Sequence, residues 1–471
     1  MTTTERSTKG GEFLIGATPV DEIFTPEDFS GEQRRLADTT KQFLTREVLP
    51  NVERIENQDL PLVVSLLKRA GGMGLLAIDV PEEYGGLELD KATNALVIET
   101  ISCDIGFSGA FTTHTGIATI PLVYYGTKAQ KEKYLGRIIT GELITAYCLT
   151  ETESGSDALG AKTSAVLSAD GRYYVLNGTK QFITNGGIAD IFRAESIVYR
   201  VAGLLDRRLA SIEKETPNYY GVYQKGIEEY SAECAIAKVY CSEAVGRIAD
   251  EALQIHGGYG CMQTYPVERF YRDARPSRIV EGTNEINRLL ISGTLLKRAM
   301  TGEIDLLPRA MKAAETVDAG APAAPEGTGP FPAEYALLAN LKSVFLAVTG
   351  SAVRTHMEKL RDEQEILMAL VDAAIEIFVL ECAVLRAVKA ATASAGSRAE
   401  TMAASVKVCA CHGAAAVRQA AARTAAYTEE GKRLAGLVEN IEVFCRYDLS
   451  GLLAAKRTLA TAALDAEKYI F

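Results

Sequence analysis

Apolar residues recur at helical intervals through the first 144 positions of the chain. This spacing predicts a helix from Glu32 towards Glu56, with Ser30 placed to cap its first turn. The residues that carry the spacing are Leu36, Phe43, Leu44, Val48 and Leu49. Similar patterns run from Lys91 to Ile105 and from Gln130 to Arg137. Residues 21–144 are therefore predicted to form one helical domain.

After Leu143 the pattern changes to short segments rich in residues that favour β-strands. Turn signals such as Ala169-Asp170-Gly171 and Asn177-Gly178 separate these segments, which favours antiparallel pairing. The predicted strands are Ile144–Leu149, Thr163–Leu167, Tyr173–Leu176 and Gln181–Thr184. Residues 145–192 are accordingly predicted to form an antiparallel β domain.

Helical spacing returns at Ala194 and continues to about residue 300. A second helix is predicted from Ile227 to about Ile255, where Gly257-Gly258 provides a stop signal. A third helix is predicted to begin near Thr283. Residues 193–300 are predicted to form a helical bundle domain.

A run rich in Pro, Gly and Ala at 317–332 is typical of a linker. Beyond it, residues 333–471 carry almost continuous helical patterns, which suit a further helical bundle. The predicted fold class is α+β but mostly α. It comprises an N-terminal helical domain, a reduced antiparallel β domain, a helical bundle domain and an extra C-terminal helical domain.

Composition narrows the functional class. The chain has 471 residues, 47% hydrophobic and 24% charged, as expected for a globular protein. Its net charge of -11 disfavours binding to nucleic acid or anionic membranes through bulk electrostatics. No apolar run approaches the ~20 residues of a membrane span, and the polar start lacks the apolar core of a signal peptide. The nine scattered cysteines favour reduced thiols in a cytoplasm, and Cys409, Cys411 and His412 are interpreted as packing residues rather than metal ligands.

Two segments of the β region carry residues suited to binding a cofactor. Tyr147 to Asp157 places hydroxyls and a glycine after a strand end, which suits a phosphate-bearing group, although a hydroxyl-rich turn is the commoner explanation. In the second segment, Phe182 and Thr184 share one face of a strand. A planar ring could stack on Phe182 while Thr184 bonds to its edge, but a buried Phe beside a capping Thr explains the same spacing.

Two further segments lie in the helical region that follows. Gln254 to Gly260 reads as a helix that ends in a glycine-rich loop, and a lone His256 there is more often structural than catalytic. Glu281 directly precedes a helix start, and Gly282 leaves room for a ligand. A partly desolvated carboxylate in such a place is a suitable base for a carbon acid. A Glu that serves the first helical turn electrostatically explains this motif equally well when it is taken alone.

Together and in this order, the four segments resemble those of the acyl-CoA dehydrogenase family. The resemblance extends from the N-terminal helices through Arg298, and the C-terminal half is similar to the very-long-chain type. It implies FAD as the cofactor. The implied contacts are Tyr147, Thr150 and Ser156 beside the flavin, Phe182 and Thr184 against its ring, Gln254 and Gly258 at the adenine end of an FAD held by a partner subunit, and Thr283 and Glu285 near the pyrophosphate and ribose. Ser156 is also implied to lie near the CoA arm.

The resemblance also implies a reaction. Glu281 occupies the position of the family's catalytic base, with Gly282 beside the substrate. It would take the α-proton of a fatty acyl-CoA while a β-hydride passes to the flavin, giving a trans-2-enoyl-CoA, as in fatty acid β-oxidation. Reduced flavin would then pass its electrons to an electron-transfer flavoprotein, and the protein would be a homodimer.

The chain departs from the family after Phe192, where a strand-like sequence leads into a helix without a turn residue. In the family, the rest of the β domain, an acyl-CoA-binding helix and an Arg-x-x-Phe-Gly segment that binds FAD across the dimer belong here. Residues 145–192 provide only about four strands, whereas a two-sheet sandwich takes about seven. Half of such a domain would expose an apolar face and unpaired strand edges. A true deletion, such as a defective gene copy or a sequencing error, is therefore favoured over a compact variant.

Two hypotheses follow. In the first, the chain is an acyl-CoA dehydrogenase or descends directly from one, which the retained Ser156, Thr184 and Glu281 favour. In the second, it is a flavin-poor, inactive remnant that serves only as a helical interaction or dimerisation protein, which the missing acyl-binding helix favours. The sequence leaves the chain-length preference open, because the residues that set pocket depth fall largely in the missing segment.

Overall fold

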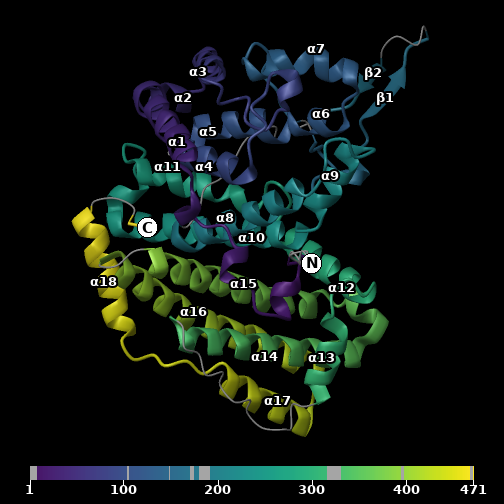
Figure 1. Ribbon diagram of the computed structural model, residues 1–471, viewed down its shortest axis with the longest axis vertical. Helices are drawn as coiled ribbons and strands as arrows, with labels where there is room; N and C mark the ends of the chain where they lie inside the picture. Colours follow the sequence, from purple (N-terminus) through teal and green to yellow (C-terminus); the bar gives the residue numbers. More distant parts are fainter. Residues whose placement is uncertain are drawn as a thin grey trace, which may run out of the picture.

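The computed structural model describes residues 8–102, 105–147, 149–169, 174–179, 191–315, 330–393, 397–466 and 470–471. Helices dominate the arrangement in Figure 1. The helices of residues 31–139 lie at the top, those of residues 191–256 cross the middle, and those of residues 332–428 lie below. A two-stranded arm projects from the upper part of the molecule (Figure 1).

The N-terminal region is helical, as predicted. Its helices are α1 Gly31–Phe43, α2 Val52–Glu56, α3 Leu60–Gly72, α4 Lys91–Ile101, α5 Ile105–Thr112, α6 Ile120–Tyr125 and α7 Lys128–Ile139. The predicted cap at Ser30 is confirmed, because its side chain accepts a hydrogen bond from the Gln33 amide at 3.2 Å and the Gln33 side chain accepts one in return. The helix predicted to run on to Glu56 is interrupted after Phe43 by a wider turn before Pro50, whose missing amide proton prevents regular α-helical bonding.

Two of the predicted strands form in the described part of the β region. β1 Ser164–Leu167 pairs antiparallel with β2 Tyr174–Asn177, and all four residues of β1 are exposed. The predicted strand Ile144–Leu149 is wrong for its described residues, which have no strand structure. The last predicted strand, Gln181–Thr184, lies outside the described residues. The described β region is thus an exposed ribbon rather than a packed domain.

The next helices follow the predicted order with shifted boundaries. α8 Ile191–Ala210 begins three residues before Ala194. The second predicted helix corresponds to α10 Ser231–His256, which begins four residues after Ile227, whereas the preceding helix α9 Tyr219–Glu228 was not predicted. α10 ends at Gly257 as predicted, with a φ of 57° that glycine adopts readily. Then follow α11 Pro266–Ala274 and α12 Asn284–Met300.

The C-terminal region is helical, as predicted, and contributes most of the largest apolar core. Its helices are α14 Pro332–His356, α15 Gln364–Ala393, α16 Ser397–Thr428, α17 Gly431–Phe444 and α18 Leu452–Ala466. α13 Leu306–Glu315 was not predicted and packs against α14 so closely that a Cβ at Gly350 would lie 2.0 Å from the Ala310 carbonyl oxygen. Most of the predicted linker at 317–332 lies outside the described residues.

One helical stretch, Pro332–Asp362, has the length and apolar composition that a membrane span requires. The sequence analysis did not single it out. Most of its apolar window is buried inside the protein, as in the core helix of a globular fold.

A buried ion cluster joins α8 to the C-terminal helices. Arg200 on α8 donates to Glu381 on α15 at 2.8 Å, and Lys342 on α14 donates to the other oxygen of the same carboxylate. Thr18, from the N-terminal segment, donates to Glu381 at 3.0 Å. Burial alone would raise the pKa of Glu381, but the two cations hold it below its ordinary value. The cluster therefore fixes four separate parts of the chain around one carboxylate.

Removing that carboxylate should destabilise the fold severely. In Glu381→Leu, both cations lose their buried partner, so the free energy of unfolding should fall by about 3–5 kcal/mol. Urea unfolding followed by circular dichroism measures the change. Glu365→Leu, an exposed position in the first turn of the same helix, is the matched control and should change stability by no more than about 0.5 kcal/mol. Equal effects for the two variants would contradict the structural role of the cluster.

His114 links the end of the N-terminal helical region to the start of the β region through hydrogen bonds. Its Nδ1 accepts a hydrogen bond from the Thr145 amide at 3.0 Å, and its Nε2 lies 3.0 Å from the Ile138 carbonyl oxygen. Both bonds need the neutral ring with its proton on Nε2. Burial lowers the pKa of His114, against the opposing effect of the Ile138 carbonyl.

Stability should consequently fall in mild acid. The folded pKa of His114 lies below the ordinary value of 6.5, so the unfolded chain binds a proton first as the pH decreases. The stabilising contribution is complete above about pH 6.5 and decreases as the pH falls towards the folded pKa. Melting curves between about pH 5 and 8 measure this slope. His114→Gln should flatten it, and an unchanged slope in that variant would assign the effect to other groups.

Candidate functional site

Glu281 lies in a tight turn immediately before α12. The predicted helix start is confirmed, since the Thr283 side chain accepts a hydrogen bond from the Ile286 amide at 3.3 Å and caps the first turn. Glu281 and Gly282 have φ values of 56° and 80°. The left-handed conformation is favourable for glycine but unfavourable for glutamate, so neighbouring groups must hold this turn in place.

Asn287, in the first turn of α12, forms hydrogen bonds with the backbone of the tight turn that contains Glu281. Its side-chain amide donates to the carbonyl oxygens of Glu281 at 3.3 Å, Gly282 at 2.8 Å and Thr283 at 3.2 Å. Asn287 is buried, so its side chain has little room to move away from these three carbonyl oxygens. The sequence analysis missed this residue, and only its place six positions after Glu281 could have indicated it.

The electrostatic surroundings of Glu281 suit a proton acceptor. The Glu281 residue is exposed to solvent, but nearby protein atoms still desolvate its carboxylate. This partial burial raises the pKa of Glu281, and the positive charge of Lys238 opposes the increase. A carboxylate whose pKa is raised in this way binds a proton more firmly than an ordinary glutamate.

A polar cavity of about 450 Å³ lies beside the turn, between α10, α11 and the start of α12. Thr283 and Glu285, both predicted cofactor contacts, line it, as do the three arginines Arg247, Arg275 and Arg278. The Nε of Arg278 is buried and has no hydrogen-bond partner. Guanidinium groups beside the amino end of a helix form a favourable place for an anion such as a phosphate.

The other predicted residues that the structure describes do not line this cavity. Tyr147 and Ser156 are exposed, and Gln254 and Gly258 are exposed at the end of α10. Phe182 and Thr184 lie outside the described residues. His256 makes a local bond, with Nδ1 2.8 Å from the Ala252 carbonyl oxygen, which agrees with a structural interpretation.

Around Thr150 the described hydrogen bonds are those of a tight turn. Glu151 accepts bonds from the amides of Lys162 at 2.6 Å and Thr163 at 2.9 Å, and Ser154 donates to the Asp157 carbonyl. A hydroxyl-rich turn, the commoner explanation of this motif, describes these contacts well.

The fit to FAD is therefore partial. The three arginines of the cavity suit a diphosphate, whereas the carboxylates of Glu243, Asp250 and Glu285, which line the same cavity, oppose an anion. The ring end has no comparable enclosure among the described residues, because β1 has no buried residue and Tyr174 and Val175 of β2 are also exposed. A flavin ring needs walls on both faces to be bound tightly, and this ribbon does not supply them.

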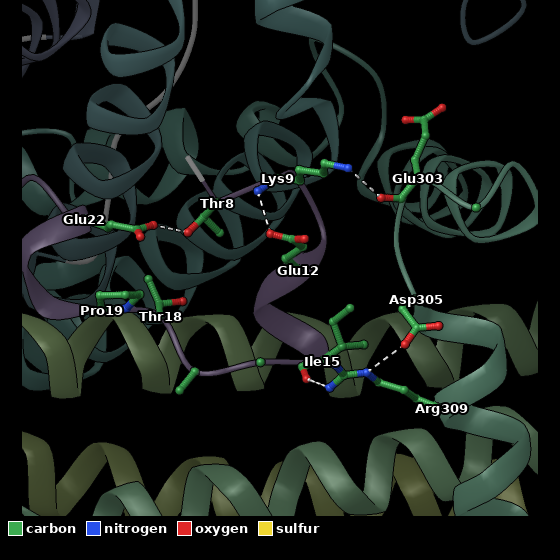
Figure 2. Close-up of a pocket in the computed structure, with 13 residues that line it drawn as sticks. Thr8, Lys9, Glu12, Ile15, Thr18, Pro19, Glu22, Glu303, Asp305 and Arg309 are labelled. Carbon is green, nitrogen blue, oxygen red and sulfur yellow. Dashed lines mark hydrogen bonds and ion pairs between the residues drawn. The ribbon is translucent and has the colours of Figure 1, made fainter. Parts of the chain in front are cut away.

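A further cavity lies elsewhere. About 600 Å³ lies between the N-terminal segment and the α12–α13 connection, where Figure 2 shows its charged side chains pairing with neighbours. Lys9 donates to the Glu303 carbonyl at 3.1 Å, and Arg309 pairs with Asp305 at 3.3 Å. Arg309 also donates to the Ile15 carbonyl oxygen, so these contacts join the N-terminal segment to α13 and to the connection before it.

The Cys409, Cys411 and His412 group shows no metal-binding arrangement. Cys409 is buried in α16, and His412 Nδ1 lies 3.5 Å from a Glu376 oxygen. Within the described ranges, no group of three or more His, Cys, Asp or Glu side chains could hold a metal ion.

Gly282→Ala should destabilise the protein. A Cβ at this position would lie 3.0 Å from Asn287 Nδ2, and the φ of 80° is unfavourable for alanine. The expected loss is about 1–2 kcal/mol in urea unfolding. Gly293→Ala is the matched control on α12, where added Cβ meets open space within a helix. It should stabilise the protein by about 0.5–1 kcal/mol, and a destabilisation of similar size in both variants would contradict this account.

Comparison with known proteins gives matches along most of the chain. Family models of the acyl-CoA dehydrogenase N-terminal domain match residues 30–142, of the middle domain 146–209, and of two C-terminal domains 190–296 and 340–441. A probable acyl-CoA dehydrogenase of Bacillus subtilis is 32% identical over 98% of each chain. The mitochondrial very long-chain specific acyl-CoA dehydrogenase of Mus musculus is 28% identical over 59% of this chain and 60% of its own.

Structural comparison agrees. The crystal structure of an acyl-CoA dehydrogenase complexed with FAD from Bacillus anthracis covers 98% of this chain and 100% of its own, with a TM-score of 0.93 and 32% identity. The helical framework described above is therefore similar to the framework of that protein.

The alignment with the Bacillus subtilis protein also supports the predicted missing segment. It spans 584 positions, 113 more than the 471 residues of this chain. At least that many positions of the alignment consequently have no counterpart here. The middle-domain and C-terminal matches overlap at 190–209, a stretch that contains the junction at Phe192. With full-length similarity and a shared framework, this chain belongs to the acyl-CoA dehydrogenase family of FAD-dependent oxidoreductases.

Proposed function

We propose that the chain is built to convert a fatty acyl-CoA to a trans-2-enoyl-CoA with Glu281 as the base, and that its shortened middle domain leaves it with little of this activity. The observation that carries the first part is the Glu281 turn, in which a partly desolvated carboxylate is held before a helix start. The exposed ribbon of β1 and β2 carries the second part.

In the proposed reaction, Glu281 accepts the α-proton of the acyl thioester. The raised pKa of its carboxyl group favours holding that proton. Lys238 and Asn287 keep the turn in one conformation while the charge of the carboxylate changes. Bound FAD would accept the hydride, and Thr283, Glu285 and the three cavity arginines are the residues proposed to hold its phosphate end.

The wider assignments belong to the same proposal. The substrate is a fatty acyl-CoA, the pathway is fatty acid β-oxidation, and the electron acceptor is an electron-transfer flavoprotein. The protein acts as a homodimer in the cytoplasm, in which Gln254 and Gly258 meet the adenine end of the partner's cofactor. Support comes from family membership and from the exposure of both residues at the end of α10.

A second candidate function is that of a helical interaction protein without catalysis. One observation favours it: the chain lacks at least 113 positions of a full-length relative, while its helical framework is retained. The absorbance spectrum of the purified protein separates the two functions. Stoichiometric FAD would refute our account of the shortened domain, whereas a colourless protein that stays colourless after FAD addition would favour the second function.

Glu281→Gln should remove the base without removing its volume. The variant is made in a chain whose missing positions are supplied from the Bacillus subtilis relative, because the present chain lacks them. The rate of flavin bleaching by acyl-CoA should fall at least ~10²–10⁴-fold while bound flavin is retained. Glu365→Gln is the control and should leave the rate unchanged. A near-normal rate in Glu281→Gln would show that another carboxylate is the base, as in family members whose base lies on the helix missing here.

A further inference from the structure

Lys238 reaches the Glu281 turn from the neighbouring helix α10. Its Nζ donates to the Gly282 carbonyl oxygen at 2.6 Å and to Asn284 Oδ1 at 2.8 Å. The two acceptors stand on either side of Thr283, so one ammonium group bridges the turn and the first residue of α12. The backbone of Gly282 is thus held from two sides, by Lys238 and by Asn287.

Asn284 presents its oxygen to Lys238 because the rest of its amide is fixed. Its Nδ2 donates to Ser242 Oγ at 3.0 Å and to Glu243 Oε1 at 3.1 Å, both on α10. With Nδ2 engaged there, Oδ1 faces the ammonium group. Asn284 is buried, which leaves no solvent to replace these bonds.

We propose that Lys238 is a positioning residue for Glu281, whose ammonium group fixes the unfavourable backbone of the turn and supplies the positive charge opposite the carboxylate. This inference rests on the proposed function of Glu281 as the base. It adds a residue that acts on Glu281 both through the backbone of the turn and through its positive charge.

The charges around the pair support this role. The acidic groups that face Lys238 are Glu281, Glu285 and Glu243. Burial lowers the pKa of Lys238, and these carboxylates oppose that effect. Burial likewise raises the pKa of Glu281, and the positive charge of Lys238 opposes this increase. Each group therefore favours the charged form of the other.

A purely structural lysine would hold the turn without affecting the carboxylate, so the test must measure the carboxylate itself. The full chain is labelled with ¹³C at the glutamate carboxyl groups, and the Glu281 signal is identified by its loss in Glu281→Gln. Its titration is followed by NMR in wild-type protein, Lys238→Met, Lys238→Arg and the exposed control Lys225→Met. Neither FAD nor substrate is added, so the outcome does not depend on turnover.

In Lys238→Met the titration midpoint of Glu281 should rise by roughly half to one pH unit, as expected for loss of an opposite charge at a partly exposed site. Lys238→Arg should restore most of the wild-type midpoint, and Lys225→Met should not change it. An unchanged midpoint in a folded Lys238→Met protein would overturn the inference, even if Glu281 is the base. If Lys238→Met does not fold, Lys238→Arg provides the test. The inference would then be overturned if the Glu281 midpoint in Lys238→Arg moved from the wild-type value by the full shift expected for loss of the positive charge. Loss of turnover in Glu281→Gln tests the proposed function separately.

Discussion

The carboxylate of Glu381 is the contact on which the arrangement of the chain depends. It lies in the interior between Arg200 and Lys342, and the Arg200 guanidinium also rests 4.4 Å from the centre of the Phe378 ring. Buried charges are stabilised only when they are closely paired and hydrogen-bonded, so these contacts constrain how α8, α14 and α15 approach one another. A second buried arginine, Arg386 on α15, pairs with Glu195 on α8 and with Glu27. These contacts explain why α8 keeps its place although it begins next to the shortened β region.

A chain of polar contacts connects this framework to the Glu281 turn. Glu243 accepts from Asn284 and from Arg288, and Arg288 also pairs with Asp372 on α15 at 2.9 Å. Asp372 in turn pairs with Arg423 on α16. The carboxylates of Glu243 and Asp372 each pair with two donors. A displacement of α15 would therefore disturb contacts made by α10 and α12. The C-terminal helices thus support the proposed base without contributing a residue to the turn itself.

The sequence predicted those features that depend on local pattern. Ser30 as a cap, Gly257 as a stop and the helix start after Glu281 follow from the conformations and side-chain bonds of neighbouring residues. Ile144–Leu149 has the composition of a strand, but the Thr145 amide is bonded to His114, 31 residues earlier. The spacing of apolar residues in the sequence gives no indication of such a long-range contact. Lys238 and Gly282 are separated by 44 positions for the same reason, so the residue that holds the turn could not be found from spacing.

The position of the shortened region determines which half of the proposed site is affected. The proposed base lies in the turn before α12, and the arginine-lined cavity lies between α10, α11 and the start of α12. Of these helices, α10 and α12 share the apolar core of the C-terminal helices. The predicted flavin-ring contacts belong to the β region, whose described part has no such support and is an exposed pair of strands. An isolated two-stranded ribbon is marginally stable in water, because it buries too little apolar surface to offset the ordering of its backbone. The two halves of the proposed site therefore differ in structural support. The surrounding helices hold the proposed proton-accepting half in place, whereas the proposed ring-binding half lacks the second sheet against which it would pack.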